Sequence, residues 1–126
     1  MGIDAMPCGR EQQVEQQVEQ QVRVEPDADG VRVIVCAGEF EYYGLDALES
    51  ACATAAADPE VRRIVLDVRQ VTFADSSMLT LMLLLRRSGR LVLAGPLPVQ
   101  LDRRMTLTAI RDLFPVVDGT ENARAV

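Results

Sequence analysis

Residues 61 to 95 contain two strand-like segments on either side of a helix-like one, and this arrangement constrains the fold most. The first segment, VRRIVLDV, contains an apolar run typical of a strand covered on both faces, and the last, RLVLAG, has the same character. A strand, a helix and a strand over about 35 residues form a βαβ unit, whose strands pair in parallel through a right-handed crossover. The chain is therefore predicted to contain a parallel sheet.

Three small polar residues, Asp75, Ser76 and Ser77, stand at the start of the intervening helix. Asp75 is a good N-cap because its carboxylate can accept hydrogen bonds from the free amides of the first turn. Both serines are then at the carboxyl end of a strand, where α/β proteins usually bind ligands and where free amides favour an anion. Two interpretations stay open: the trio only caps the helix, or one hydroxyl is phosphorylated and acts as an electrostatic switch.

The body of this helix is apolar on nearly every side. Of the eight residues from 78 to 85, only Thr80 is not apolar. Such a helix must be buried on most sides or must offer part of its surface to a partner. Burial is the expected outcome, and a partner surface is the alternative.

The remaining segments extend the sheet. Turn formers at residues 25 to 30 separate a short strand around 22 to 24 from the β-branched run VRVIVCAG, which predicts an antiparallel hairpin. Residues 114 to 117 indicate a last short strand or an extended edge. Helices are expected at 44 to 57, 99 to 109 and, weakly, 121 to 126. Together these elements predict an α/β fold, a small mixed β-sheet with helices packed mainly on one face.

The N-terminal segment EQQVEQQVEQQV, residues 11 to 22, repeats one tetrapeptide three times. Only one residue in four is apolar, and a lone helix this short is marginal in water. We therefore expect residues 1–21 to form a flexible extension rather than a coiled coil, and residues 22–126 to form a single domain.

Charge and hydropathy exclude several functional classes. The net charge of −6 and the pI near 4.6 argue against a nucleic-acid surface, which needs clustered Lys and Arg. No apolar run reaches the ~18 residues of a membrane-spanning helix, and the first residues lack the pattern of a secretory signal. A cytoplasmic protein without membrane insertion is expected.

Cysteine and histidine content narrows the chemistry further. The cysteines are Cys8, Cys36 and Cys52, and their spacing matches no metal motif. Cys36 falls in a strand pattern and Cys52 in a helix pattern, so both are expected to be small buried hydrophobic residues. The chain has no histidine, which removes Ser-His-Asp catalysis and His-ligated zinc. No metal or other cofactor is expected.

The stretch IVLDVRQVTFADSSML, residues 64 to 79, resembles the signature of STAS domains, in particular bacterial anti-sigma factor antagonists. GEFE, residues 38 to 41, is similar to the family's Gly-Glu-Leu-Asp after its second strand. The segment from 91 to 118 is similar to its Gly-Pro, helix, Leu-Phe-Pro ending. The resemblance covers residues 22 to 118 in the family's order, so residues 22–126 are expected to be a single STAS domain.

The resemblance implies a partner-switching regulator of sigma-factor-dependent transcription. In the family, the first serine of Asp-Ser-Ser is phosphorylated by a serine kinase that is, or is related to, the anti-sigma factor. Phosphorylation releases the antagonist, and a phosphatase resets it. Carried over by position, Ser76 is the expected phosphoacceptor, with Ser77 as the less favoured one. Asp75, Ser77, Met78 and Glu41 are the expected partner-binding residues, although Glu41 can equally be a solvated acid at a strand end.

Three positions depart from the family pattern. Met78 replaces a glycine after Asp-Ser-Ser, Glu41 replaces an aspartate, and Ala109 replaces a glycine common near the end of a helix. Met78 would place a flexible apolar side chain where a kinase approaches. This departure keeps open an alternative, a STAS scaffold subunit of a stress-signalling or transporter-associated complex that is not itself phosphorylated.

An enzyme is the other class of function. Ser76 or Ser77 would be the nucleophile, with Asp75 or Glu41 as the base. Because the chain has no histidine and no glycine-bounded nucleophile turn, we expect a binding module and not an enzyme.

Overall fold

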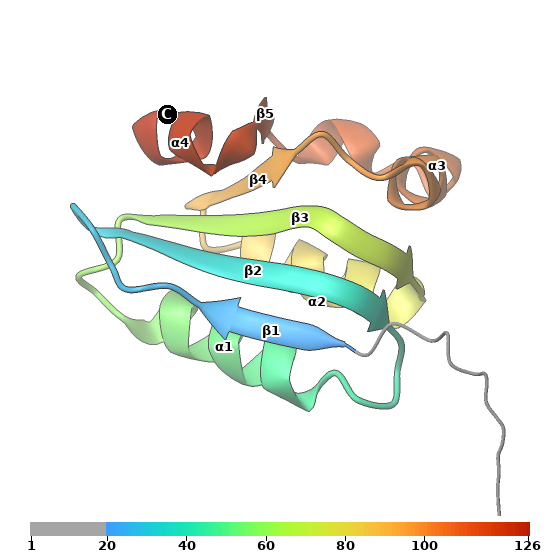
Figure 1. Ribbon diagram of the computed structural model, residues 1–126, viewed down its shortest axis with the longest axis horizontal. Helices are drawn as coiled ribbons and strands as arrows, with labels where there is room; N and C mark the ends of the chain where they lie inside the picture. Colours follow the sequence, from blue (N-terminus) through green and yellow to red (C-terminus); the bar gives the residue numbers. More distant parts are fainter. Residues whose placement is uncertain (1–19) are drawn as a thin grey trace, which may run out of the picture.

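The computed structural model describes residues 20–126, which form a five-stranded mixed sheet with four α-helices (Figure 1). Cys8 and most of the tetrapeptide repeat lie outside the described residues. The expected flexible extension, residues 1–21, also lies almost entirely outside them. The elements in chain order are β1 (Gln21–Val24), β2 (Val31–Phe40), α1 (Asp46–Ala57), β3 (Arg63–Ala74), α2 (Ser76–Arg86), β4 (Leu91–Gly95), α3 (Val99–Leu107), the short 3-10 helix η2 (Arg111–Leu113), β5 (Val116–Asp118) and α4 (Gly119–Ala125).

The predicted hairpin is confirmed. β1 runs antiparallel to β2, with Val22 opposite Cys36. The turn between them contains Asp29 at φ 54° and Gly30 at φ 76°, so two successive residues take the left-handed conformation that reverses a chain tightly. Asp and Gly are the residue types that tolerate this conformation best, which explains the turn formers in the sequence.

The predicted parallel sheet is also confirmed. β2 pairs in parallel with β3, β3 with β4, and β4 with β5, so the strand order in the sheet equals the order in the chain. When successive parallel strands are added on the same side with right-handed crossovers, their connecting helices lie on one face. α1 and α2 accordingly lie on one face of the sheet (Figure 1). α3 packs on the same face, since its Leu101 and Met105 belong to the same core cluster.

The opposite face of the sheet carries a second, smaller apolar cluster. It consists of valines from β2, β3 and β4, and it is covered by α4 through the fully buried Ala123. The expectation that helices pack mainly on one face is therefore confirmed, with α4 as the exception. Asp67 is the one buried charged residue among those described, and Arg69 Nε and Nη2 donate to its two carboxylate oxygens over 2.9 and 2.8 Å.

β3 is longer than the sequence indicates. The pattern predicts a strand ending at Val68, whereas β3 continues to Ala74. Two register shifts against β2 interrupt its alternation, and Arg69 and Gln70 are both exposed in succession. A bulge of this kind resets which side chains face the core. The strand therefore continues past residues that look like a loop, and Ala74 ends up paired with Phe40 at the end of β2.

Candidate functional site

Asp75 connects the start of α2 to the loop that follows β2. Its Oδ1 accepts hydrogen bonds from the backbone N–H of Ser77 at 2.8 Å and of Met78 at 3.3 Å, so the predicted N-cap is confirmed. Its Oδ2 accepts a further bond from Tyr42 N at 2.9 Å, and its own N–H donates to Phe40 O at 3.1 Å. One residue thus holds two chain segments more than thirty positions apart at the carboxyl edge of the sheet.

Glu41 lies at this edge because both of its chain neighbours bind Asp75. Phe40 O and Tyr42 N are the two partners described above, so the backbone of Glu41 is fixed beside the N-cap while its side chain is exposed. The structure therefore brings Glu41, Asp75 and Ser76 together. Ser76 is exposed as the first residue of α2, and Ser77 is half-buried.

Met78 differs from the expectation. Its side chain is fully buried in the main core, because the third residue of α2 points toward the sheet. Met78 therefore offers no surface to an approaching protein in this conformation. Met78 contributes to the site by packing in the core under the first turn of α2.

The rest of α2 is buried on the face toward the sheet and exposed along a narrow stripe. Met78, Leu79, Met82 and Leu85 are buried. Ser76, Thr80 and Leu84 are exposed and recur every fourth residue, which places them along one side of the helix. Leu84 keeps 54% of its surface exposed. Burial thus accounts for most of the apolar sequence, and Leu84 is the apolar residue left on the outer face.

A hollow between α1 and α2 adjoins the serines. Its volume is about 620 Å³, and its lining residues are Tyr42, Tyr43, Gly44, Leu45, Asp46, Glu49, Ser77 and Thr80. Tyr42 and Tyr43 are 69% and 88% exposed and pack edge to face with ring centroids 5.1 Å apart. Exposed aromatic side chains of this size are characteristic of protein interaction surfaces. The sequence reasoning missed both tyrosines, although they are the only two in the chain and adjoin Glu41.

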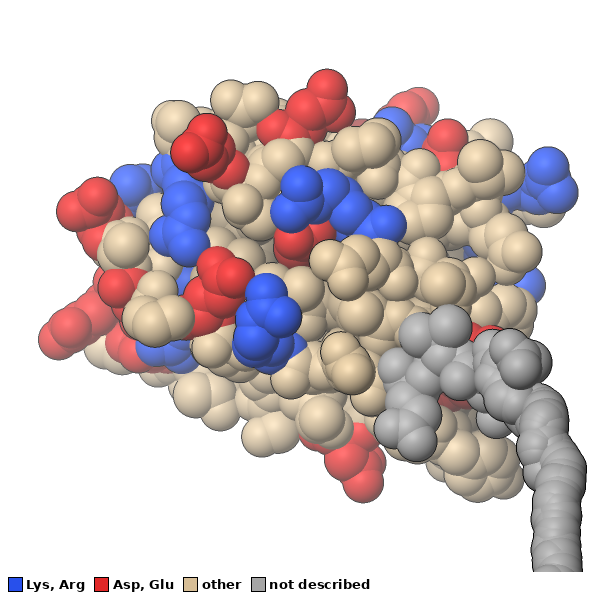
Figure 2. Space-filling model, viewed as in Figure 1, with Lys and Arg blue, Asp and Glu red and all other residues tan. Residues whose placement is uncertain are grey.

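The charges around the site are local rather than spread over a broad patch. Figure 2 shows acidic and basic side chains interspersed over the face that it displays. Near the serines, Asp46 and Glu49 line the hollow on the α1 side, whereas Arg103 and Arg104 line a separate pocket beside Phe73 and Ala74.

The two described cysteines belong to the core, as predicted. Cys36 and Cys52 are buried free thiols. Burial raises the pKa of Cys36 well above its usual value and raises that of Cys52 to about 12. Because the thiolate is the reactive form, neither thiol is suited to nucleophilic chemistry.

The carboxylate of Asp75 has a structural role at this site. Both oxygens of Asp75 already accept backbone N–H groups, so its carboxylate is occupied in holding the site together. No helix in residues 20–126 is both long and apolar enough to cross a membrane. Ser76 is therefore an exposed serine next to a residue anchored by hydrogen bonds, with aromatic and charged side chains nearby.

Comparisons with known proteins agree with the fold. The family model described as STAS domain matches residues 20–123. A crystal structure of an anti-sigma factor antagonist from Mycobacterium paratuberculosis is similar, with 26% identity, a TM-score of 0.70, and coverage of 85% of this chain and 92% of that one. No curated protein sequence matches the chain.

Two structures of SpoIIAA share the fold at 20% identity. The unphosphorylated anti-sigma factor antagonist has a TM-score of 0.68 and covers 84% of this chain and 98% of its own. The phosphorylated form, described as a Bacillus cell fate determinant, has a TM-score of 0.62 with coverage of 81% and 96%.

Proposed function

Because the chain belongs to the STAS domain family, we propose that it is an anti-sigma factor antagonist that binds an anti-sigma factor with serine kinase activity and is released when Ser76 is phosphorylated. A phosphatase then restores the binding form. The similarity to an anti-sigma factor antagonist at 26% identity over most of both chains supports the general role. The protein acts by binding and is not an enzyme.

The observation that carries the proposal is the placement of Ser76. It is exposed, it begins α2, and it directly follows a capping residue that is fixed by bonds on both of its oxygens. A kinase can therefore reach the hydroxyl without unfolding the helix. A phosphate at this point would add about −1.5 to −2 charges beside Asp75 and Glu41. That change in a fixed surface is sufficient to alter binding of a partner.

The burial of Met78 bears on the alternative of a scaffold that is not phosphorylated. That alternative depends on Met78 lying in the path of a kinase. Since the Met78 side chain is fully buried, the approach to Ser76 is not obstructed by it. We therefore favour the phosphorylation switch.

The test uses the kinase that co-purifies with the protein from its native host. Incubation of the full chain with that kinase and ATP is expected to add one phosphate, which mass spectrometry of peptides assigns to Ser76. Ser77→Ala, a matched change one residue away, should still be phosphorylated, whereas Ser76→Ala should not. Ser76→Ala is expected to bind the kinase and to stay bound in ATP, and Ser76→Asp is expected to bind poorly. Unchanged mass after incubation with a bound, active kinase would contradict the proposal.

A further inference from the structure

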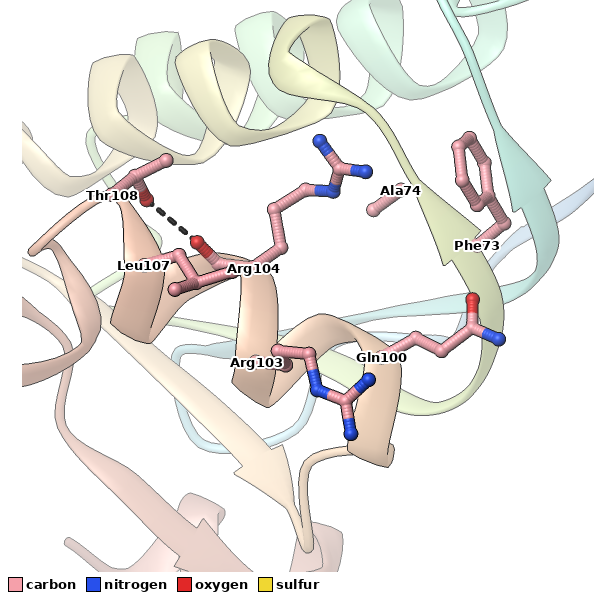
Figure 3. A pocket seen from close by; sticks show the side chains of 7 residues that line it. All are labelled: Phe73, Ala74, Gln100, Arg103, Arg104, Leu107 and Thr108. Carbon is pink, nitrogen blue, oxygen red and sulfur yellow. Dashed lines mark hydrogen bonds between the residues drawn. The ribbon is translucent and has the colours of Figure 1, made fainter.

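A second hollow lies on the other side of the Ser76 corner, between the end of β3 and the outer face of α3. Its volume is about 340 Å³, and we call it the α3 pocket. Figure 3 shows its seven lining side chains, with Arg104 extended from α3 toward the end of β3. The lining residues are Phe73, Ala74, Gln100, Arg103, Arg104, Leu107 and Thr108.

The α3 side of this pocket is a helix face that no other element of residues 20–126 covers. The five lining residues of α3 and its C-cap follow helical spacing, whereas Leu101 and Met105 form the opposite, buried face. Leu107 keeps 79% of its surface exposed. An exposed leucine beside the half-buried ring of Phe73 provides an apolar ledge next to the two arginines.

The charge of the pocket is positive although the chain as a whole carries −6. Arg103 and Arg104 supply it, and among the described residues the lining contains no carboxylate. Within residues 20–126 neither guanidinium forms an ion pair, whereas the nearby Asp102 is paired with Arg111. Arg104 lies over the Phe73 ring at 5.6 Å from its centroid, a cation–π contact that orients the guanidinium without neutralising it.

We propose that the α3 pocket docks an acidic segment of the partner protein, with a carboxylate on the arginine pair and a neighbouring aliphatic side chain against Phe73 and Leu107. This inference rests on the proposed function, because it assigns a second contact to the same partner. Guanidinium groups bind carboxylates through paired, charge-assisted hydrogen bonds. The adjoining apolar ledge favours a peptide segment over a free anion, which would leave that ledge uncovered.

The position of the pocket couples it to the switch. Ala74 lines the pocket and stands two residues before Ser76, so their Cα atoms are at most about 7.6 Å apart. This separation is comparable to the screening length of about 8 Å at physiological ionic strength. We therefore expect a phosphate on Ser76 to lower the positive potential on this side of the pocket and so to weaken binding of the acidic segment.

The test is an NMR titration of the full, isotope-labelled chain with a blocked hexapeptide of alternating Glu and Leu. Amide shifts are expected at Phe73, Ala74 and residues 100 to 108, and a peptide of alternating Lys and Leu should not produce them. Arg103→Glu should weaken binding of the acidic peptide by about fivefold or more. Arg87→Glu is the matched control, because Arg87 is also an exposed arginine, at the C-cap of α2, and lies outside the pocket.

The same titration tests the coupling, with Ser76→Asp expected to bind the peptide several-fold more weakly than Ser76→Asn. Thermal melting of each variant shows that it is folded. Equal losses in Arg103→Glu and Arg87→Glu, equal binding of the lysine peptide, or no binding at millimolar peptide would overturn the proposal. Because the peptide needs no kinase, these outcomes are independent of whether Ser76 is phosphorylated by the native partner.

Discussion

Ala109 and Met78 both stand where the family pattern usually has glycine. Glycine would suit the backbone at Ala109, but it would remove a core side chain at Met78. Ala109 ends α3 at φ 63°, a left-handed conformation in which a Cβ is unfavourable. Ile110 N donates to Met105 O at 2.9 Å. This hydrogen bond is typical of a helix C-terminus at which the residue just after the helix, here Ala109, is left-handed. Met78, in contrast, is in ordinary helical backbone and fills the core.

Ala109→Gly is therefore expected to stabilise the protein. Removing the Cβ relieves about 1–2 kcal/mol of left-handed strain, and the greater freedom of glycine in the unfolded chain offsets about 0.5–1 kcal/mol of that gain. The free energy of unfolding in urea should rise by about 0.5–1 kcal/mol. Ala109→Val, which adds branching at the same backbone angle, should lower it, and a rise in both variants would contradict this explanation.

Met78→Gly is expected to do the reverse. Loss of a fully buried side chain costs about 2–5 kcal/mol and glycine inside a helix about 1 kcal/mol more, so the free energy of unfolding should fall by about 3–6 kcal/mol. Met78→Leu keeps the volume and should cost less than about 1.5 kcal/mol. Similar urea midpoints for the glycine and leucine variants would show that the side chain is not in the core.

The buried thiols allow a direct check of the core. Cys36 and Cys52 should resist alkylation by iodoacetamide at pH 8 in the native protein, because burial raises the pKa of both thiols and excludes the reagent. Peptide mapping along a urea series should show both sites becoming reactive together with unfolding. Labelling of either site in native buffer without loss of structure would contradict its placement.

At the scale of elements, the corner that carries Ser76 depends on Asp75. Asp75→Ala removes three acceptor bonds, those to Ser77 N, Met78 N and Tyr42 N. The loss of the cap alone should cost about 1–2 kcal/mol. Hydrogen exchange should become faster both in the first turn of α2 and in residues 41 to 44.

Asp75→Asn is the matched control, since an amide oxygen can still cap the helix. It should keep the first turn of α2 protected. If exchange in Asp75→Ala rose only in α2 and not in the loop after β2, the bond to Tyr42 would not be what holds that loop.

The types of secondary-structure element were largely predictable from the sequence. The contacts at the site that depend on tertiary packing were not. The βαβ pattern, the hairpin turn and the Asp75 cap each have a local signature. The end of β3 has none, because the register shifts after Val35 and Gly38 of β2 depend on how two distant strands pair. Arg104 and Phe73 likewise meet only because α3 lies beside β3, and a single sequence contains no signal for that contact.

At the scale of the whole molecule, Arg32 joins the hairpin turn to the end of α1. Its guanidinium binds Asp27 through bonds of 2.9 and 2.8 Å and Asp58 through one of 2.9 Å. The hydrogen bond from Arg32 lowers the pKa of Asp27 below its ordinary value of 3.8. Stabilisation by this carboxylate is therefore complete above pH 3.8 and is lost as the pH falls through the lower pKa of the folded state.

Asp27→Asn should accordingly destabilise the protein at pH 6 by no more than about 1 kcal/mol, since Asp27 is largely exposed. The difference from the unmodified protein should disappear only as the pH falls through the lowered pKa of Asp27 in the folded state, below which both chains carry a neutral side chain at this position. Asp112→Asn, which changes an exposed carboxylate in η2, should show little difference at either pH. If the difference in free energy of unfolding between Asp27→Asn and the unmodified protein persisted in acid, the effect of the substitution would not come from the charge of Asp27.

The identity between strand order and chain order has a consequence for how the protein is made. As the chain leaves the ribosome, each strand from β2 onward finds its neighbour already synthesised, and none has to be inserted between two strands that are already paired. The sheet can therefore grow at one edge in step with translation, with α1, α2 and α3 closing over it in turn. The corner at Asp75 and Ser76 is complete once α2 has emerged, so it can form before β4 and β5 exist.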